Sequence, residues 1–339
     1  MEIKQEKVLV TGASGYIALH CISELLKKGY KVKGSLRDMS KEPIIRKYFV
    51  CENEKSNLEF CKLNLLSDEG WDNAVSDCEY IMHIASPFVI EEPKNEKDLI
   101  EPALEGTLRA LNAANRNKIK KFILTSSMAS VAYGHKSEIC NKNNWTDTSK
   151  NVGAYVRSKT IAERAAWDFI KDNNVSFPLT TIHPGMVFGP LISNEIRGAS
   201  VNLIANMING KFPALPDIYF TIVDVRDIAK LHVDSLKNQN SNNKRILATS
   251  ENGIPFLDIS RILRNLGFEK SPQNIIPNQV INSLAAFNKE MRITSSMIKR
   301  GFYKVDLSDT ISIFNWQPVP LEETLYDMTK SIQKILNKE

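Results

Sequence analysis

The hydrophobic pattern near the start of the chain changes its period at a pair of glycines. Residues 8–10 form a short apolar run rich in β-branched side chains, which predicts a strand buried on both faces. From Tyr16 the apolar residues recur at helical spacing, and Gly29 provides the expected end of that helix. A strand, a glycine turn and a helix in this order predict the opening unit of a dinucleotide-binding fold.

Further strands and helices alternate through the N-terminal half of the chain. Strands are expected at residues 30–36, 58–63, 79–84, 121–125 and 179–183, and helices at residues 98–117 and from Tyr155 onward. This alternation predicts an α/β fold with a Rossmann-type, doubly wound parallel sheet and right-handed crossovers. The polar, asparagine-rich residues 237–244 indicate a surface loop.

The glycine turn predicts an anion site. Gly12 and Gly15 let the backbone approach a pyrophosphate closely, and the following helix turns its unpaired N–H groups toward that anion. The cofactor contacts predicted here are Gly12, Ala13, Ser14, Gly15, Tyr16 and Ile17. The spacing Gly-x-x-Gly-x-x-Ala differs from the usual G-x-G-x-x-G, so a glycine turn without a ligand is the alternative interpretation.

The end of the second strand selects between the two nicotinamide cofactors. An acidic residue there binds the ribose hydroxyl of NAD, whereas an arginine accommodates the 2′-phosphate of NADP. Arg37 and, four residues on, Lys41 favour NADP(H), because a guanidinium offers forked donors to a phosphate. Asp38 keeps NAD open, since a shift of one residue would place its carboxylate on the ribose. Ile84, Ala85 and Ser86, at the carboxyl end of the fourth strand, are further predicted cofactor contacts, because small residues there let the cofactor lie across the strand end.

Candidate catalytic residues follow the fifth strand. Tyr155 and Lys159 are spaced i, i+4 on one predicted helix, so both side chains can point at one ligand. A nearby ammonium favours the phenolate and lowers the pKa of a tyrosine from its usual value of about 10. Ser127 can donate a hydrogen bond to a carbonyl oxygen that gains charge. Tyr326 and Lys330 repeat the spacing, but lie outside any such context and indicate a surface pair on a C-terminal helix.

Composition and charge exclude several classes of partner. The 339 residues include 44 Lys and Arg against 39 Asp and Glu, a net charge of +5, and the basic residues are scattered. No nucleic-acid partner is therefore expected. No apolar leader and no run of 18 apolar residues is present, so neither a secretory signal nor a membrane span is expected. The five cysteines lack C-x-x-C spacing, which predicts reduced thiols in a cytoplasmic protein and no metal site.

Together these motifs resemble the extended branch of the short-chain dehydrogenase/reductase superfamily. The resemblance is greatest to dihydroflavonol reductase-like enzymes, which include plant dihydroflavonol and cinnamoyl-CoA reductases and fungal aldehyde/ketone reductases of the methylglyoxal type. It is carried by residues 11–20, Arg37, residues 83–87, 125–127, 145–147, 155–167, 183–190, 223–227, 315–318 and 321–324. Asn64 and His183 depart from the pattern, which more often has Asp and Asn at these positions.

This resemblance implies further cofactor contacts. Asn64 and Leu65 would touch the adenine, Pro184, Gly185 and Val187 would back the nicotinamide, and Ser200 would lie beside the cofactor. It also implies two lobes: an NADP-binding domain of residues 1–190 plus 221–250, and a substrate-binding lobe of residues 191–220 plus 251–339. Asp224 and Asp227 are expected to cap a helix that begins at Ile228, and Arg226 to bridge the two lobes.

The substrate pocket is less defined. Phe88, Met128 and Met186 are candidates for an apolar lining beside Ser127, and packing in the core explains each of them equally well. Fold analogy carries no information about the substrate. We expect a small-molecule carbonyl substrate and a monomer or homodimer.

Three functions are compatible with the sequence. The leading one is an NADPH-dependent carbonyl (aldehyde or ketone) reductase, in which hydride passes from the nicotinamide and Tyr155 protonates the oxygen. The second is an NAD-dependent nucleotide-sugar epimerase or dehydratase, which shares the fold and triad but prefers an acidic residue in place of Arg37. The third is a non-catalytic NADP-sensing binding protein, which has no need of an intact Ser127, Tyr155 and Lys159.

Overall fold

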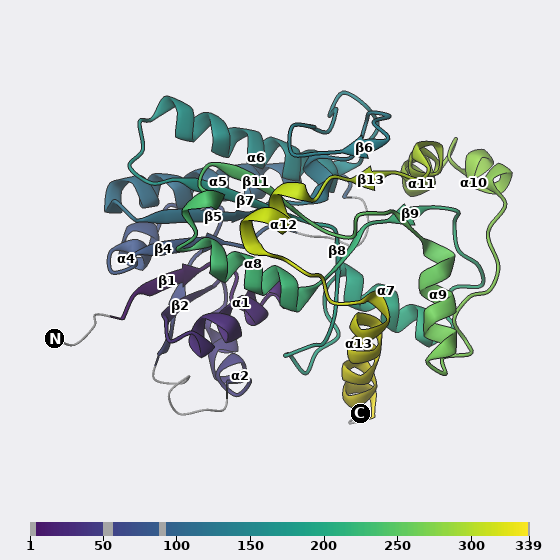
Figure 1. Ribbon diagram of the computed structural model, residues 1–339, viewed down its shortest axis with the longest axis horizontal. Helices are drawn as coiled ribbons and strands as arrows, with labels where there is room; N and C mark the ends of the chain where they lie inside the picture. The colour runs from purple at the N-terminus through teal and green to yellow at the C-terminus, as the bar shows by residue number, and fades with distance from the viewer. Residues whose placement is uncertain (1–4, 50–56, 88–92, 338–339) are drawn as a thin grey trace.

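A seven-stranded parallel sheet lies at the centre of the larger part of the molecule (Figure 1). The computed structural model describes residues 5–49, 57–87 and 93–337. The strands run in the spatial order β3-β2-β1-β4-β5-β7-β11, and every pair in the sheet is parallel. Their bounds are β1 Lys7–Val10, β2 Lys31–Leu36, β3 Leu58–Lys62, β4 Tyr80–His83, β5 Lys121–Thr125, β7 Leu179–Pro184 and β11 Lys244–Ala248. This order confirms the predicted Rossmann-type sheet.

Helices cover both faces of this sheet. On one face α1 (Tyr16–Lys27) packs beside α8 (Val225–Ser235), and on the other lie α4 (Trp71–Val75), α5 (Lys97–Asn117) and α6 (Ala154–Asp172) (Figure 1). Val8 and Val10 belong to the core on the α1 side, whereas Leu9 between them belongs to the core on the α5 side. This is why β1 is a continuous apolar run and does not alternate with polar residues.

A second group of helices packs beside the carboxyl ends of the strands. Helices α7 (Ala199–Ile208), α9 (Phe256–Asn265) and α13 (Leu321–Leu336) share a separate apolar core. Two small sheets join it: β8 (Met186–Phe188) with β10 (Ile222–Asp224), and β9 (Tyr219–Phe220) with β12 (Ile254–Pro255). Helices α10 (Asn278–Leu284) and α11 (Lys289–Arg300) lie at its outer end (Figure 1). These elements come mainly from the residues predicted to form the substrate-binding lobe.

One C-terminal segment predicted for that lobe lies against the larger sheet. Strand β13 (Lys304–Val305) pairs with β6 (Ile139–Cys140), and α12 (Ser308–Phe314) packs on β11. The Thr310 hydroxyl donates a 2.6 Å hydrogen bond to the Leu247 carbonyl. The division into two lobes stays a prediction, with residues 304–314 in contact with the nucleotide-binding sheet.

Local capping fixes where the helices begin and end. Gly29, just beyond the end of α1, has φ +80°, a backbone conformation that glycine adopts without strain. The prediction that a helix begins at Ile228 was wrong, because α8 begins at Val225. Asp224 is its N-cap, and the Asp224 carboxylate accepts a hydrogen bond from the Arg226 N–H at 2.7 Å. Asp227 lies in the first turn and accepts a hydrogen bond from the Val319 N–H.

Arg226 links the two groups of helices. Its guanidinium donates to the Asp224 carboxylate at 2.8 Å and to Asp327 on α13 at 2.7 Å. Arg226 therefore joins the start of α8 to α13, and its role as a bridge between two lobes stays a prediction.

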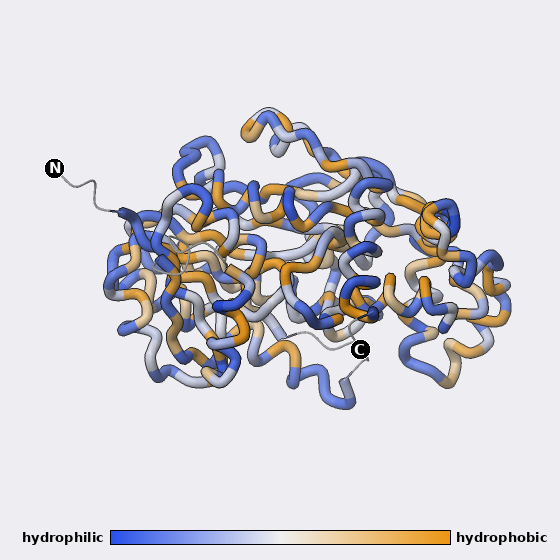
Figure 2. The backbone as a smooth tube through the Cα atoms, turned by 90° about the horizontal axis from the view of Figure 1, so that it is seen from below, coloured by the Kyte–Doolittle hydropathy of each residue, from blue (hydrophilic) through white to orange (hydrophobic). Residues whose placement is uncertain are grey.

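Short 3-10 and helical turns complete the chain: η1 (Met39–Lys41), α2 (Glu42–Arg46), η2 (Met128–Ser130) and η3 (Gln239–Ser241). Turn η3 falls in the segment predicted as a surface loop. Along most of the trace hydrophobic and hydrophilic residues alternate every few positions (Figure 2). Within the described residues no helix combines the length and apolarity that a membrane span requires.

Candidate active site

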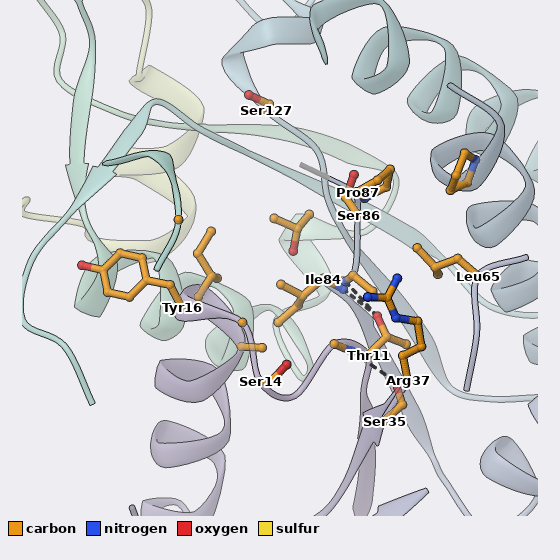
Figure 3. Close-up of a pocket in the computed structure, with 18 of the residues that line it drawn as sticks. Thr11, Ser14, Tyr16, Ser35, Arg37, Leu65, Ile84, Ser86, Pro87 and Ser127 are labelled. Atoms are coloured by element: carbon orange, nitrogen blue, oxygen red, sulfur yellow. Dashed lines mark hydrogen bonds between the residues drawn. The ribbon is translucent and has the colours of Figure 1, made fainter. Parts of the chain in front are cut away.

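A cavity of about 790 Å³ opens at the carboxyl ends of the strands. This is where open α/β sheets bind their ligands. Its walls come from the glycine turn, from the ends of β2, β4 and β5, from α6 and from the first turn of α7. Figure 3 shows Arg37 and Ser127 toward different ends of this cavity. The cavity therefore joins the predicted cofactor residues to the predicted catalytic residues.

The glycine turn is held in place by hydrogen bonds that it donates to Ser35 on β2. Gly12 has φ +70°, and a Cβ there would lie 3.1 Å from Ala85 on the neighbouring strand end. The Gly12 N–H donates to the Ser35 hydroxyl, and the Ala13 N–H donates to the Ser35 carbonyl at 2.9 Å. Both N–H groups are therefore already used. The N–H groups of Tyr16, Ile17 and Ala18, in the first turn of α1, precede the first intrahelical bond, which Leu19 donates to the Gly15 carbonyl.

One predicted contact in this turn differs from expectation. Ala13 is fully buried beneath the turn and does not line the cavity, whereas Gly12, Ser14, Gly15, Tyr16 and Ile17 do. The reason is that the Ala13 side chain points inward, away from the cavity. It packs so close to β2 that a Cβ added at Gly34 would collide with it.

Thr11 organises the wall beside the glycine turn, a role that the sequence reasoning missed. Its hydroxyl oxygen accepts hydrogen bonds from the N–H groups of Ile84 and Ala85, both at 3.0 Å (Figure 3). These bonds satisfy two backbone donors where β4 ends and bring residues 84–86 to the cavity wall. A hydroxyl residue directly between β1 and the first glycine was the available signal.

The residues after β2 face the end of the cavity predicted for the adenosine. Arg37, Asp38 and Lys41 all line it, and Arg37 and Asp38 are exposed. The Asp38 carboxylate, however, caps η1 by accepting a hydrogen bond from the Ser40 N–H at 3.0 Å. Because this capping contact engages the Asp38 carboxylate in its own turn, Arg37 and Lys41 are the groups available to bind an anion.

Asn64 and Leu65 line the same end of the cavity. The Asn64 side-chain oxygen accepts a hydrogen bond from the Leu66 N–H at 3.1 Å, so it also holds its own turn. Pro184, Gly185, Val187 and Ser200 also line the cavity, and their contact with the cofactor stays a prediction. Ser200 lies in the first turn of α7.

The three predicted catalytic side chains come together at the other end. Tyr155 and Lys159 lie on α6, Ser127 is the N-cap of η2, and all three line the cavity. Burial raises the pKa of Tyr155, and its hydrogen bond with Ser127 opposes this shift in part. The predicted lowering of this pKa is therefore not seen. Burial lowers the pKa of Lys159 to about 8, and its ammonium donates to the Thr125 carbonyl at 3.1 Å.

The residues proposed for the substrate pocket are placed differently. Met128 is buried in the main core, and Met186 is half-buried against the core of the smaller group of helices, so neither lines the cavity. Met128 packs inward because η2 turns the chain immediately after Ser127. Phe88 lies outside the described residues.

The second Tyr-x-x-x-Lys pair is a surface feature, as predicted. Tyr326 and Lys330 lie on α13, where the ammonium sits 4.3 Å from the centre of the exposed tyrosine ring. Neither residue lines the cavity. Among the described residues no group of three or more His, Cys, Asp or Glu side chains is placed to hold a metal ion.

Comparison with known proteins identifies the family of the chain. The sequence pattern of the NAD dependent epimerase/dehydratase family matches residues 8–248. The chain belongs to this family. It is 37% identical over 267 residues to a cinnamoyl-CoA reductase of Medicago truncatula, covering 76% of this chain and 80% of the relative. It is 31% identical over 280 residues to an NADPH-dependent methylglyoxal reductase of Saccharomyces cerevisiae, covering 76% and 81%.

Solved structures of family members agree in fold over nearly the whole chain. The yeast methylglyoxal/isovaleraldehyde reductase complexed with NADPH superimposes with a TM-score of 0.81 at 25% identity, covering 98% of this chain and all of that one. The corresponding NADPH complex from Candida albicans gives 0.79 at 28% identity, covering 98% and 99%. The resemblance to the reductase branch is therefore confirmed.

Proposed function

We propose that the chain is an NADPH-dependent reductase of aldehydes or ketones. The observation that carries this proposal is one cavity whose walls include the glycine turn and Arg37 at one end and Ser127, Tyr155 and Lys159 at the other. The similarity to named NADPH-dependent reductases supports it. The whole cavity, about 790 Å³, is large enough for a cofactor and a small substrate together.

The residues present fit a dinucleotide phosphate. The first turn of α1 would hold the pyrophosphate through its N–H groups, and Arg37 with Lys41 would hold the 2′-phosphate. Asn64 and Leu65 would flank the adenine, residues 84–86 would lie beneath the cofactor, and Pro184, Gly185, Val187 and Ser200 would border the nicotinamide. Bound NADPH supplies the hydride for carbonyl reduction.

The chain's own residues then donate the proton to the carbonyl oxygen and stabilise the negative charge that develops on it. With its pKa raised by burial, Tyr155 is a neutral phenol at neutral pH, the state required to donate a proton to the carbonyl oxygen. Ser127 would donate a hydrogen bond to the same oxygen as its charge grows. Lys159 would orient the nicotinamide ribose and stabilise the phenolate that remains on Tyr155 after the proton has left.

The cofactor preference gives a direct prediction. Replacing the cationic side chain in Arg37→Glu should raise the KM for NADPH by at least about tenfold, because a charge-assisted hydrogen bond is lost and a repulsive charge is gained. The KM for NADH should change by less than about threefold, since NADH carries no 2′-phosphate. Steady-state kinetics with both cofactors check this, with Asp38→Asn as the neighbouring control. Equal changes for the two cofactors would show that Arg37 is not the phosphate site.

The proposed reaction is tested by the loss of reduced-nicotinamide absorbance. NADPH and NADH are compared over a panel of aldehydes, diketones and aromatic ketones, with wild type and Tyr155→Phe side by side. Turnover with NADPH that is lost in the variant supports the reductase. A lack of turnover with every carbonyl, together with nicotinamide cofactor retained through purification, would instead favour an epimerase or dehydratase acting on nucleotide sugars.

The proposal also covers location and assembly. The four cysteines among the described residues are free thiols, which suits a reducing compartment, and we place the protein in the cytoplasm. We expect a monomer or homodimer, which light scattering distinguishes by mass.

A further inference from the structure

Beneath the catalytic residues, α6 carries a fully buried carboxylate. Glu163 lies one helical turn beyond Lys159, on the same face of the helix, and its side chain has no exposed surface. It makes hydrogen bonds to several other elements of the structure. An ionised group in such a position requires compensation, because an isolated buried charge is strongly destabilising.

The first set of contacts reaches the segment that presents Ser127. The hydroxyls of Ser126 and Ser130 both donate to the Oε2 atom of Glu163, at 2.6 Å and 2.5 Å. The Ser130 backbone N–H donates to the Ser127 carbonyl at 2.9 Å. The two serines bracket Ser127 in the sequence, so this one carboxylate oxygen fixes the turn on both sides of it.

The second set of contacts keeps Glu163 ionised. Arg245 on β11 donates through Nε to Oε1 at 2.7 Å, and His183 on β7 donates through Nε2 at 2.8 Å. Although burial alone would raise it, these two partners hold the pKa of Glu163 well below its ordinary value. Burial lowers the pKa of His183, so Arg245 is the permanent cation of the cluster.

Glu163 also faces Lys159. Both residues line a small cavity of about 10 Å³, whose other walls come from the ends of β4 and β5 and from α5. The walls contain no carboxylate besides Glu163 and no cation besides Lys159 within the described residues. His83 is the other titratable group there, and burial lowers its pKa to about 3, so it is neutral. Burial disfavours the ammonium of Lys159, and the charge of Glu163 acts in the opposite direction.

We propose that Glu163 is a positioning residue of the active site, whose ionised carboxylate fixes the turn that presents Ser127 and supplies the negative charge beneath the Lys159 ammonium. The catalytic meaning of this role rests on the proposed reductase function. Glu163 does not line the larger cavity, in which substrate and cofactor are proposed to bind. It acts through Ser126 and Ser130 on one side and through Lys159 on the other.

The experiment measures the ionisation of Lys159 in the protein without cofactor or substrate. Acetic anhydride reacts only with the neutral amine, so the labelling of Lys159 followed by mass spectrometry across pH gives its titration midpoint. Glu163→Gln keeps the shape of the side chain and removes its charge. We expect its midpoint to lie about one pH unit below that of wild type, the effect of losing one close opposite charge. Glu163→Asp retains the charge and should titrate close to wild type.

The matched control is another buried carboxylate paired with an arginine. Asp224 has no exposed side-chain surface and pairs with Arg226 at 2.8 Å, but it lines neither cavity. Asp224→Asn should lose stability and leave the Lys159 midpoint unchanged. If Glu163→Gln folds, as its circular dichroism shows, but titrates like wild type, or if Asp224→Asn shifts the midpoint equally, the proposal is overturned.

A second variant covers the case in which Glu163→Gln does not fold. Arg245→Gln removes the cation that faces the same carboxylate, so the midpoint of Lys159 should rise, and a fall would contradict the proposal. None of these measurements needs a carbonyl substrate. A failure of the reductase assay with an intact shift in the midpoint would therefore overturn the proposed function and leave the role of Glu163 standing.

In an active enzyme the charge of Glu163 should also affect the pH dependence of kcat. The pH above which kcat declines should move down in Glu163→Gln by the shift seen in the labelling, while a purely structural role would lower kcat equally at every pH. Agreement between the two shifts supports the proposal, and a uniform loss of kcat contradicts it.

Discussion

Replacing Tyr155 with phenylalanine should lower kcat for carbonyl reduction by roughly three orders of magnitude, within the range that one positioned general acid contributes. The phenol lines the cavity beside Ser127, and burial keeps it protonated, so the variant loses the proton donor without leaving a charge behind. The affinity for NADPH should change by less than about threefold, because the ring itself remains. Stopped-flow turnover and fluorescence titration of NADPH measure the two effects separately.

The chain provides its own control for this experiment. Tyr326 has the same spacing to a lysine as Tyr155, but lies on the surface of α13 beneath the Lys330 ammonium. Tyr326→Phe should therefore retain the kcat of wild type. If Tyr155→Phe loses less than about tenfold in kcat while Tyr326→Phe is unchanged, the proton comes from another group and the proposed mechanism is wrong.

The elements that carry a regular hydrophobic pattern were predictable from the sequence. The β5 prediction was correct to the residue, at Lys121–Thr125, and α5 begins one residue before its expected start. Apolar runs between two covered faces and amphipathic helices are encoded by neighbouring residues, so a local pattern suffices. The i, i+4 spacing predicted that Tyr155 and Lys159 lie on one face of a helix, and this too is local information, because both residues belong to α6.

Contacts between distant segments were not predictable in this way. The Glu163 cluster draws its partners from β7, from β11 and from the turn after β5. Nothing local marks Arg245 as the partner of Glu163, since the two residues meet only when β11 adds to the edge of the sheet beyond β7. The predicted start of α8 was wrong because both Asp224 and Asp227 have side chains suited to an N-cap. In the structure Asp224 accepts the capping hydrogen bond from the Arg226 N–H, whereas Asp227 accepts from the distant Val319 N–H, which the sequence does not reveal.

The turn between β7 and β8 gives the second large expected effect. Gly185 connects Pro184 to Met186, and a Cβ there would overlap the Thr249 hydroxyl and the Thr221 carbonyl oxygen. It would also lie 2.8 Å from the Thr221 carbonyl carbon, which is backbone and not a flexible side chain. Gly185→Ala should therefore destabilise the protein by on the order of 3 kcal/mol, the upper part of the range for overpacking. Urea denaturation followed by circular dichroism measures this loss.

The strain expected in Gly185→Ala comes from close packing and not from an unusual backbone angle. The control is therefore a glycine with an ordinary backbone angle and more room. Gly253 likewise lies outside the positive-φ glycines, but a Cβ there would meet the Tyr219 side chain and the Tyr303 carbonyl only at 3.3 Å. Gly253→Ala should cost less than about 1 kcal/mol. Since Gly185 also borders the cavity, its backbone cannot shift to relieve the overlap without moving the wall beside Pro184 and Val187. Weaker NADPH binding should accompany the loss of stability in Gly185→Ala. If Gly185→Ala is as stable as Gly253→Ala, the backbone of the turn shifts to accommodate the methyl group at little cost, and the prediction is wrong.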